Sequence, residues 1–143
     1  MTEQDDKRIR ALISERVTAM TERDADALAR QCVPDLLAFT LAPPLAHHGE
    51  DVEARKAWFA SFDGPIEYEV RDLEVTVGGD VAYSHSLTRL STTPKGMPQP
   101  FELWFRSTTG FRKVDGEWRI AHVHDSTPFY MDGTMSAALD LKP

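Results

Sequence analysis

The chain has 143 residues, 41% of them hydrophobic, and a single cysteine, Cys32. This length supports one hydrophobic core, so we expect a single domain over residues 1–143 that needs no disulfide or structural zinc. The 16 basic and 23 acidic side chains give a net charge of -7, and no run of Lys or Arg occurs. This excludes nucleic acid as an expected partner, because affinity for phosphates requires clustered positive charge.

The first residues, Met-Thr-Glu-Gln-Asp-Asp, are polar and acidic. A secretory signal would instead begin with basic residues and continue with apolar ones. No apolar run approaches the roughly 18 residues that span a bilayer. We therefore expect a cytoplasmic protein that does not interact with membranes.

Helical spacing of apolar residues predicts three helices in the first half of the chain. Between the second and third, Leu36–Leu41 predicts a buried strand that ends at Pro43-Pro44. The segment Ala46–Gly49 is expected to be a loop. The predicted helices cover residues 5–22, 25–32 and 51–62.

After Pro65 the apolar period changes from about four to two, which predicts strands joined by turns. In the first of these strands the apolar parity slips near Asp72, as it does at a β-bulge or a sharp bend. Gly78-Gly79-Asp80 predicts a turn, and Asp115-Gly116 predicts a tight hairpin. The predicted strands cover residues 66–77, 81–90, 101–114 and 117–127, with a long loop over 91–100.

Helices that precede an antiparallel meander predict an α+β fold rather than alternating βαβ units. We expect a strongly bent antiparallel sheet, shaped like a cone, with the N-terminal helices packed on its concave face. Such a cone encloses a ligand cavity where its inward side chains leave space. Residues 128–143 are expected to form a C-terminal tail, in which Met135, Leu139 and Leu141 at near-helical spacing predict a short helix.

Several motifs resemble those of one superfamily. They are the Arg23–Leu28 helix junction, Gly49 ahead of the Trp58-Phe59 helix, the strand start Gly79–Tyr83 and the hairpin Asp115–Ile120. With the order of elements, over about residues 5–129, they are similar to the nuclear transport factor 2-like superfamily, and within it to SnoaL-like and ketosteroid-isomerase-like proteins. The last strand also resembles that of the association domain of calcium/calmodulin-dependent kinase. The resemblance implies a cystatin-like α+β roll around a pocket and a homodimer formed through the outer face of the sheet.

The resemblance to ketosteroid isomerases does not extend to their acid–base residues. Those enzymes carry a carboxylate late in the first strand and a tyrosine on the first helix. Here Phe39–Leu41 contains no acid and residues 5–22 contain no tyrosine. Steroid isomerisation by that route is therefore not expected.

Three histidines on predicted strands are the candidate catalytic residues. Strict alternation along the last strand places His122 and His124 on the same face as Trp118 and Ile120, and His85 lies on another strand. A pKa of about 6.5 suits imidazole to proton transfer near neutral pH. The alternative is that these are structural histidines, hydrogen-bonded to backbone or carboxylate neighbours.

A metal ion held by the same three histidines is a further alternative, since His-x-His presents two imidazoles on one strand face. No carboxylate shares that face of the last strand, because Asp125 points to the other side. We therefore predict no metal. The chain also lacks a Gly-x-Ser-x-Gly elbow and a dinucleotide fingerprint, so we predict no cofactor.

The other predicted pocket residues come from aromatic content and strand parity. Trp104 and Arg106 share a face that would form an amphipathic cavity wall, on which an arginine would pair with a ligand carboxylate. The alternative is that Arg89, Arg106 and Arg112 pair with acids such as Glu102 on a solvated face. Parity leaves open which face of the sheet is concave. The predicted pocket residues are Phe39, Trp58, Tyr83, Trp104, Arg106 and Ser126.

Two functions are compatible with these residues. The first is an isomerase, cyclase or lyase that uses acid–base chemistry on a hydrophobic carbonyl compound. The second is a non-catalytic module of the same fold that binds a ligand or assembles as a dimer. In both, the expected partners are a hydrophobic or carboxylate-bearing small molecule and a second copy of the chain.

Overall fold

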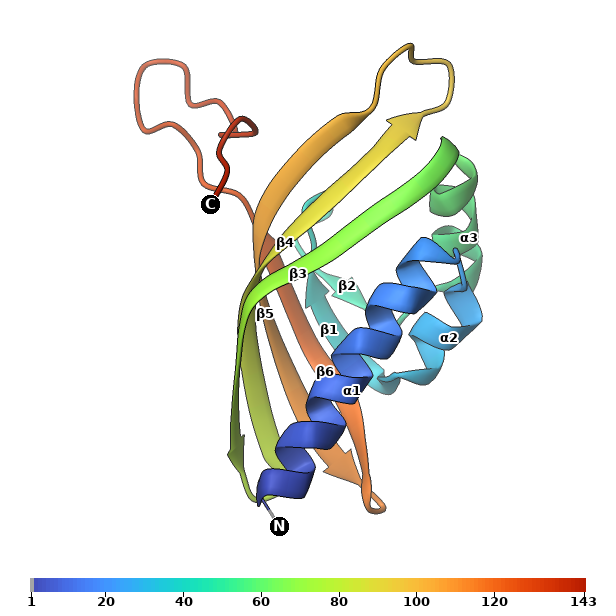
Figure 1. Cartoon of the computed structure of the whole chain (residues 1–143), viewed down its shortest axis with the longest axis vertical. Coiled ribbons are helices and arrows are strands. Elements are labelled where there is room, and N and C mark those ends of the chain that lie inside the picture. Colours follow the sequence, from blue (N-terminus) through green and yellow to red (C-terminus); the bar gives the residue numbers. More distant parts are fainter. Residues whose placement is uncertain (1) are drawn as a thin grey trace.

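The computed structural model describes residues 2–143, which form three helices and one six-stranded sheet (Figure 1). The helices are α1 (Thr2–Thr21), α2 (Ala25–Arg30) and α3 (Val52–Ala60). The strands are β1 (Cys32–Phe39), β2 (His47–His48), β3 (Phe62–Gly78), β4 (Val81–Pro94), β5 (Phe101–Val114) and β6 (Glu117–Ser126). No helix within the described residues is both long and apolar enough to cross a membrane.

The sheet has the strand order β2-β1-β6-β5-β4-β3. Consecutive strands from β3 to β6 pair antiparallel, whereas β1 lies parallel to β6. The predicted meander and the α+β fold are therefore confirmed. Parallel pairing requires a long connection between the two strands, and here that connection contains α3 and three strands of the meander.

Three local predictions are wrong. His47 and His48, expected in a loop, form the short strand β2 because they pair with Ala38 and Leu37 of β1. β4 continues to Pro94, through the predicted loop, because its last residues pair with both β3 and β5. The C-terminal tail contains no helix, and its chain folds back through a single bridge between Phe129 and Ala137.

The bend of the sheet is built into β3, where the sequence predicted it. The pairing of β3 with β4 shifts register between Arg71 and Glu74. Asp72, within this interval, has a left-handed backbone with φ of +57°. Such a bulge increases local twist and lets the two halves of β3 cover different surfaces of a curled sheet.

The helices lie on the concave side of the sheet, and Figure 1 shows the opposite, convex side without a covering helix. The apolar stripe of α1 packs there, with Ile9 and Leu12 against Phe111, Trp118 and Ile120. A second cluster joins α1, α2 and α3 to the other half of the sheet. Its buried members are Ala19, Met20, Ala25, Leu28, Phe59, Ile66, Leu90 and Phe105.

Arg23 fixes the junction between the helices and β3. Its guanidinium donates to the carbonyl oxygens of Phe59 (2.8 Å), Phe62 (3.3 Å) and Gly64. These carbonyls lie at and just after the C-terminus of α3, where backbone acceptors lack helical partners. Arg23 thereby ties the α1–α2 junction to the end of α3 and the start of β3.

Candidate functional site

A cavity of about 420 Å³ lies between the concave face, α1, α3 and the segment that joins β1 to β2. Residues 40–43 and His48 are exposed and form its mouth. Most of its inner wall is apolar, because both core clusters contribute side chains to it. The apolar lining includes Met20, Leu36, Ala38, Trp58, Leu90, Phe105 and Val123.

Asp125 places a carboxyl group in the inner wall of the cavity. It lies on β6, two residues after the buried Val123, and is itself only partly exposed. Burial raises the pKa of its carboxyl group above the ordinary value, and a hydrogen bond from the Ser107 hydroxyl acts in the opposite direction. Ser107 is in turn hydrogen-bonded to Thr88, with 2.9 Å between the two hydroxyl oxygens. Ser107 lies opposite Asp125 in the pairing of β5 with β6, so these hydroxyl groups lie beside the carboxyl group.

Tyr68 of β3 lines the same cavity. Burial, reinforced by the nearby negative charge of Asp125, raises the pKa of its phenol to about 12. Tyr68 is therefore protonated at neutral pH and is available as a hydrogen-bond donor. A phenol that donates and a carboxyl group that exchanges a proton thus face one apolar space.

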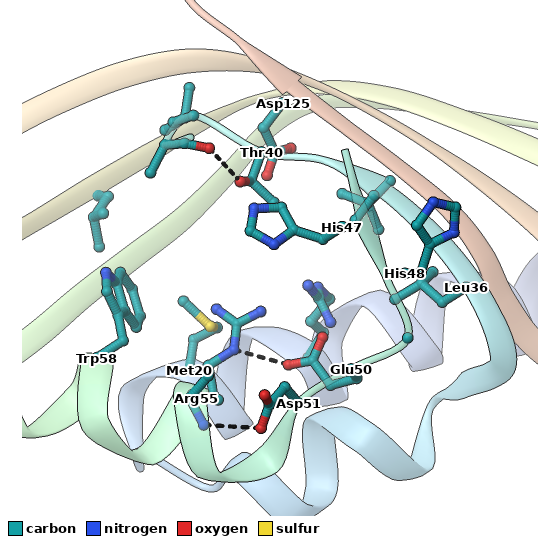
Figure 2. A pocket seen from close by; sticks show the side chains of 18 of the residues that line it. Met20, Leu36, Thr40, His47, His48, Glu50, Asp51, Arg55, Trp58 and Asp125 are labelled. Carbon is teal, nitrogen blue, oxygen red and sulfur yellow. Dashed lines mark hydrogen bonds and ion pairs between the residues drawn. The ribbon is translucent and has the colours of Figure 1, made fainter. Parts of the chain in front are cut away.

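Positively charged and imidazole side chains enter the cavity from the helices and from β2. In Figure 2 the guanidinium of Arg55 pairs with Glu50, and the ring of His47 extends over the same space. The Arg55–Glu50 distance is 2.9 Å. Nη1 of Arg16, on α1, and Nε2 of His47 are buried and have no hydrogen-bond partner among residues 2–143.

A second, narrower cavity of about 40 Å³ lies beneath α1. It shares Arg16, Tyr68, Val123 and Asp125 with the main cavity, so these residues form the boundary between the two spaces. Its own wall carries hydroxyl groups. They belong to Ser84, Ser86, Thr88, Ser107 and Thr109.

The predicted catalytic histidines lie outside both cavities, on the convex face. Nδ1 of His122 donates to the carbonyl oxygen of Leu37 at 2.6 Å. The edge of Phe39 contacts the rings of His122 and His124, with centroid distances of 5.0 and 5.3 Å. His85 is exposed and stacks on Tyr83. These contacts agree with the structural alternative for His122.

A one-residue bulge in β6 explains why alternation predicted the wrong face. Gly110 of β5 pairs with His122 and Phe111 pairs with Ile120, which leaves Ala121 unpaired. The extra residue reverses the parity of everything that follows it. Trp118 and Ile120 therefore point into the core, whereas the inward residues after the bulge are Val123 and Asp125.

Of the predicted pocket residues, Trp58 lies in the cavity wall. The others lie outside the cavity, at strand positions that face the convex side. Trp104 bonds to Glu102 and stacks against the guanidinium of Arg71, 4.7 Å from its ring centre. The residues placed outside both cavities are Phe39, Tyr83, Trp104, Arg106 and Ser126.

Two of the three strand arginines, Arg89 and Arg112, pair with acids, as the alternative interpretation expected. Arg89 lies within ion-pair distance of Glu67, Glu69 and Glu102, at 3.3 to 3.8 Å. Arg112 pairs with Asp35 at 2.9 Å. Neither faces the cavity, and the arginines that do are on α1 and α3.

His122 and His124 are neighbours on the convex face, with 6.4 Å between ring centroids. The described residues contain no group of three His, Cys, Asp or Glu side chains placed to hold one metal ion. The cavity residues that are absent from the predicted site include Arg16, His47, Tyr68 and Asp125. The sequence does show that Asp125 is the one acid between the apolar Val123 and the end of the strand. Its side chain faces the cavity only because of the bulge at Ala121.

A family model for the SnoaL-like domain matches residues 9–130. A nuclear transport factor 2-like protein of unknown function from Pseudomonas putida is 30% identical, with a TM-score of 0.87 over 100% of this chain and 99% of that chain. A search of curated proteins found no match.

Two further solved structures show the same fold at lower identity. A ketosteroid isomerase-like protein from Erwinia carotovora is 23% identical, with a TM-score of 0.71 over 84% of this chain and 93% of that one. A protein with a cystatin-like fold from Caulobacter vibrioides is 20% identical, with a TM-score of 0.72 over 85% of this chain and 87% of that one. The expected cystatin-like roll is thereby confirmed.

Proposed function

Since this chain belongs to the SnoaL-like domain family, we propose that its cavity is the active site of an isomerase or lyase that acts on a small hydrophobic carbonyl compound. The observation that carries the proposal is the partly buried carboxyl group of Asp125, set in an apolar wall together with the phenol of Tyr68. The likeness to the ketosteroid isomerase-like protein from Erwinia carotovora supports the same class of chemistry.

The two side chains supply complementary parts of a proton transfer. The carboxylate of Asp125 removes a proton from the carbon next to the substrate carbonyl, and the electron pair of the C–H bond moves onto the carbonyl oxygen. The Tyr68 hydroxyl donates a hydrogen bond to the resulting enolate oxygen. The protonated Asp125 then returns its proton, either to another carbon of the enolate or to a leaving group.

The environment of Asp125 suits this cycle. A carboxyl group whose pKa is raised by burial is a stronger base when ionised and holds the proton longer after abstraction. The cavity volume of about 420 Å³ lies within the range of small-molecule sites, about 300 to 1,000 Å³. An apolar wall also keeps water from protonating the enolate.

The test is hydrogen exchange at carbon in deuterated water, followed by NMR over a panel of cyclic and aromatic ketones. We expect the protein to exchange the proton next to the carbonyl of at least one panel member. Asp125→Asn keeps the shape of the side chain but cannot accept the proton. It should lower the exchange rate about 100- to 10,000-fold.

His124→Asn is the matched control, because it removes an ionisable group of the same strand from the convex face. Its exchange rate should equal that of the unaltered protein. Equal rates for Asp125→Asn and the unaltered protein would contradict the assignment of Asp125. Binding of a panel member without exchange would favour the non-catalytic ligand-binding module.

We further propose that two copies of the chain pair through the convex face. This face has no covering helix in Figure 1. Strand alternation places aromatic side chains on it. Tyr83 is 50% exposed, and Phe39 and Trp104 are partly exposed. Exposed aromatic groups of this kind are enriched at the centres of protein interfaces. The pairing would also remove His85 and His124 from solvent.

A further inference from the structure

One guanidinium nitrogen that lines the cavity has no hydrogen-bond partner among the described residues. Arg55 is paired with Glu50 at 2.9 Å, and both side chains are largely buried. Asp51 accepts from the backbone N–H of Ala54 and lies at the exposed rim. Nη1 of Arg16, by contrast, is buried without a hydrogen-bond partner in the described part of the chain.

A buried guanidinium nitrogen without a hydrogen-bond partner is costly, because burial removes water from a charged donor without providing a replacement. A ligand that enters the cavity can complete these hydrogen bonds. Guanidinium forms its strongest pairs with carboxylates, through two parallel N–H···O bonds. Arg16 therefore has the chemistry of an anion receptor.

We propose that the substrate is an apolar carboxylic acid bound as its anion, with Arg16 as the group that holds the carboxylate. This inference rests on the proposed function and adds the substrate class to it. Arg16 borders the main cavity and the small one beneath α1, at the boundary that also contains Tyr68 and Asp125. The anionic end then lies at the inner end of the main cavity, and the apolar body extends along Trp58 toward the mouth.

The negative charge of Asp125 acts on Arg16 through space, but Nη1 of Arg16 makes no hydrogen bond to it. Its carboxyl group takes its hydrogen bond from Ser107, a residue of the sheet, and Nη1 of Arg16 is left without a partner. A substrate carboxylate on Arg16 lies close to the proton-accepting group, which suits an acid whose reactive carbon is near its carboxyl end. His47, whose Nε2 is also buried without a partner, is a second donor on the cavity wall.

The experiment measures binding by titration calorimetry at neutral pH with two acids and their matched amides. The pairs are phenylacetate with phenylacetamide and octanoate with octanamide. We expect at least one acid to bind about 10- to 100-fold more tightly than its amide, the range given by one charge-assisted hydrogen-bond pair. In Arg16→Gln the acid and the amide should bind equally, with the amide affinity unchanged.

Arg16→Lys is the rescue variant, since it retains the charge but loses the planar fork. It should restore part of the preference for the acid. Arg10→Gln, on the exposed side of the same helix, is the matched control for charge and should keep the full preference. Circular dichroism and thermal unfolding of Arg16→Gln confirm that the variant is folded before its affinities are compared.

The same titrations in Asp125→Asn separate this proposal from the proposed function. Removal of a negative charge from the cavity should leave the preference for the acid intact or increase it, although turnover is lost. Equal affinity for acid and amide in the unaltered protein, an undiminished preference in Arg16→Gln, or no binding of any of the four compounds would each overturn the anion assignment. None of these results bears on proton exchange with neutral ketones.

Discussion

Asp125 combines two conditions that a proton-transferring carboxyl group requires, an apolar neighbourhood and a fixed orientation. Val123 and Phe105 provide the first, and the pairing of Asp125 with Ser107 across β6 and β5 contributes to the second. The same burial has an energetic consequence for the fold. The ionised carboxylate is less favourable in the apolar cavity wall than in water, so ionisation of Asp125 opposes folding.

This gives a prediction for stability against pH. The pKa of Asp125 is higher in the folded state than its value of about 3.8 in the unfolded state. Below the unfolded-state pKa the carboxyl group is neutral and its contribution to stability is fully present. That contribution is lost as the pH rises through the folded-state pKa. Asp125→Asn stays neutral at every pH. It should therefore raise the free energy of unfolding at about pH 7, by on the order of 1 kcal/mol, and much less at about pH 4.

Urea unfolding at the two pH values measures this difference. Asp63→Asn, at an exposed position of β3, makes the same change of charge and should give no comparable gain. A loss of stability at neutral pH in Asp125→Asn would mean that the ionised carboxylate is held by contacts that outweigh its burial.

At the scale of elements, two bulges decide the shape of the sheet and the composition of its inner wall. The bulge at Ala121 turns Asp125 inward and the histidines outward. The bulge at Asp72 bends β3 and uses a left-handed backbone, which costs most residues about 1 to 2 kcal/mol but suits Asp and Gly. β-Branched residues are the least compatible with positive φ.

Substitutions at Asp72 test the left-handed bulge. Asp72→Val should lower the free energy of unfolding by about 1 to 2 kcal/mol, whereas Asp72→Gly should leave it unchanged or raise it slightly. The measurement is equilibrium unfolding in urea. Thr76→Val, four residues along the same exposed side of β3, is the control and should change it by less than about 0.5 kcal/mol. Equal effects of the two valine substitutions would show that backbone conformation at Asp72 does not limit stability.

At the scale of the molecule, the two faces of the sheet have different tasks. The concave face holds the core and the cavity. The convex face carries polar and aromatic side chains and is not covered by a helix. Tyr83→Glu should convert the proposed dimer to a monomer, because a charge in the middle of an aromatic interface must be desolvated. Leu45→Glu is the matched control, since Leu45 is 96% exposed on the segment between β1 and β2.

Sedimentation velocity over a range of concentrations distinguishes the two variants. The unaltered protein and Leu45→Glu should sediment as particles of twice the chain mass, and Tyr83→Glu as single chains. A monomer in all three proteins would reject the convex face as an interface.

The sequence by itself determined the order and type of the main elements and the bend at Asp72. Local periodicity carries that information, because apolar spacing reports directly which side of a helix or strand is buried. Only the tertiary structure decided which residues line the site. Strict alternation assumes an unbroken strand, and one unpaired residue at Ala121, visible only through its pairing with β5, exchanges the two faces and replaces His122 and His124 by Val123 and Asp125.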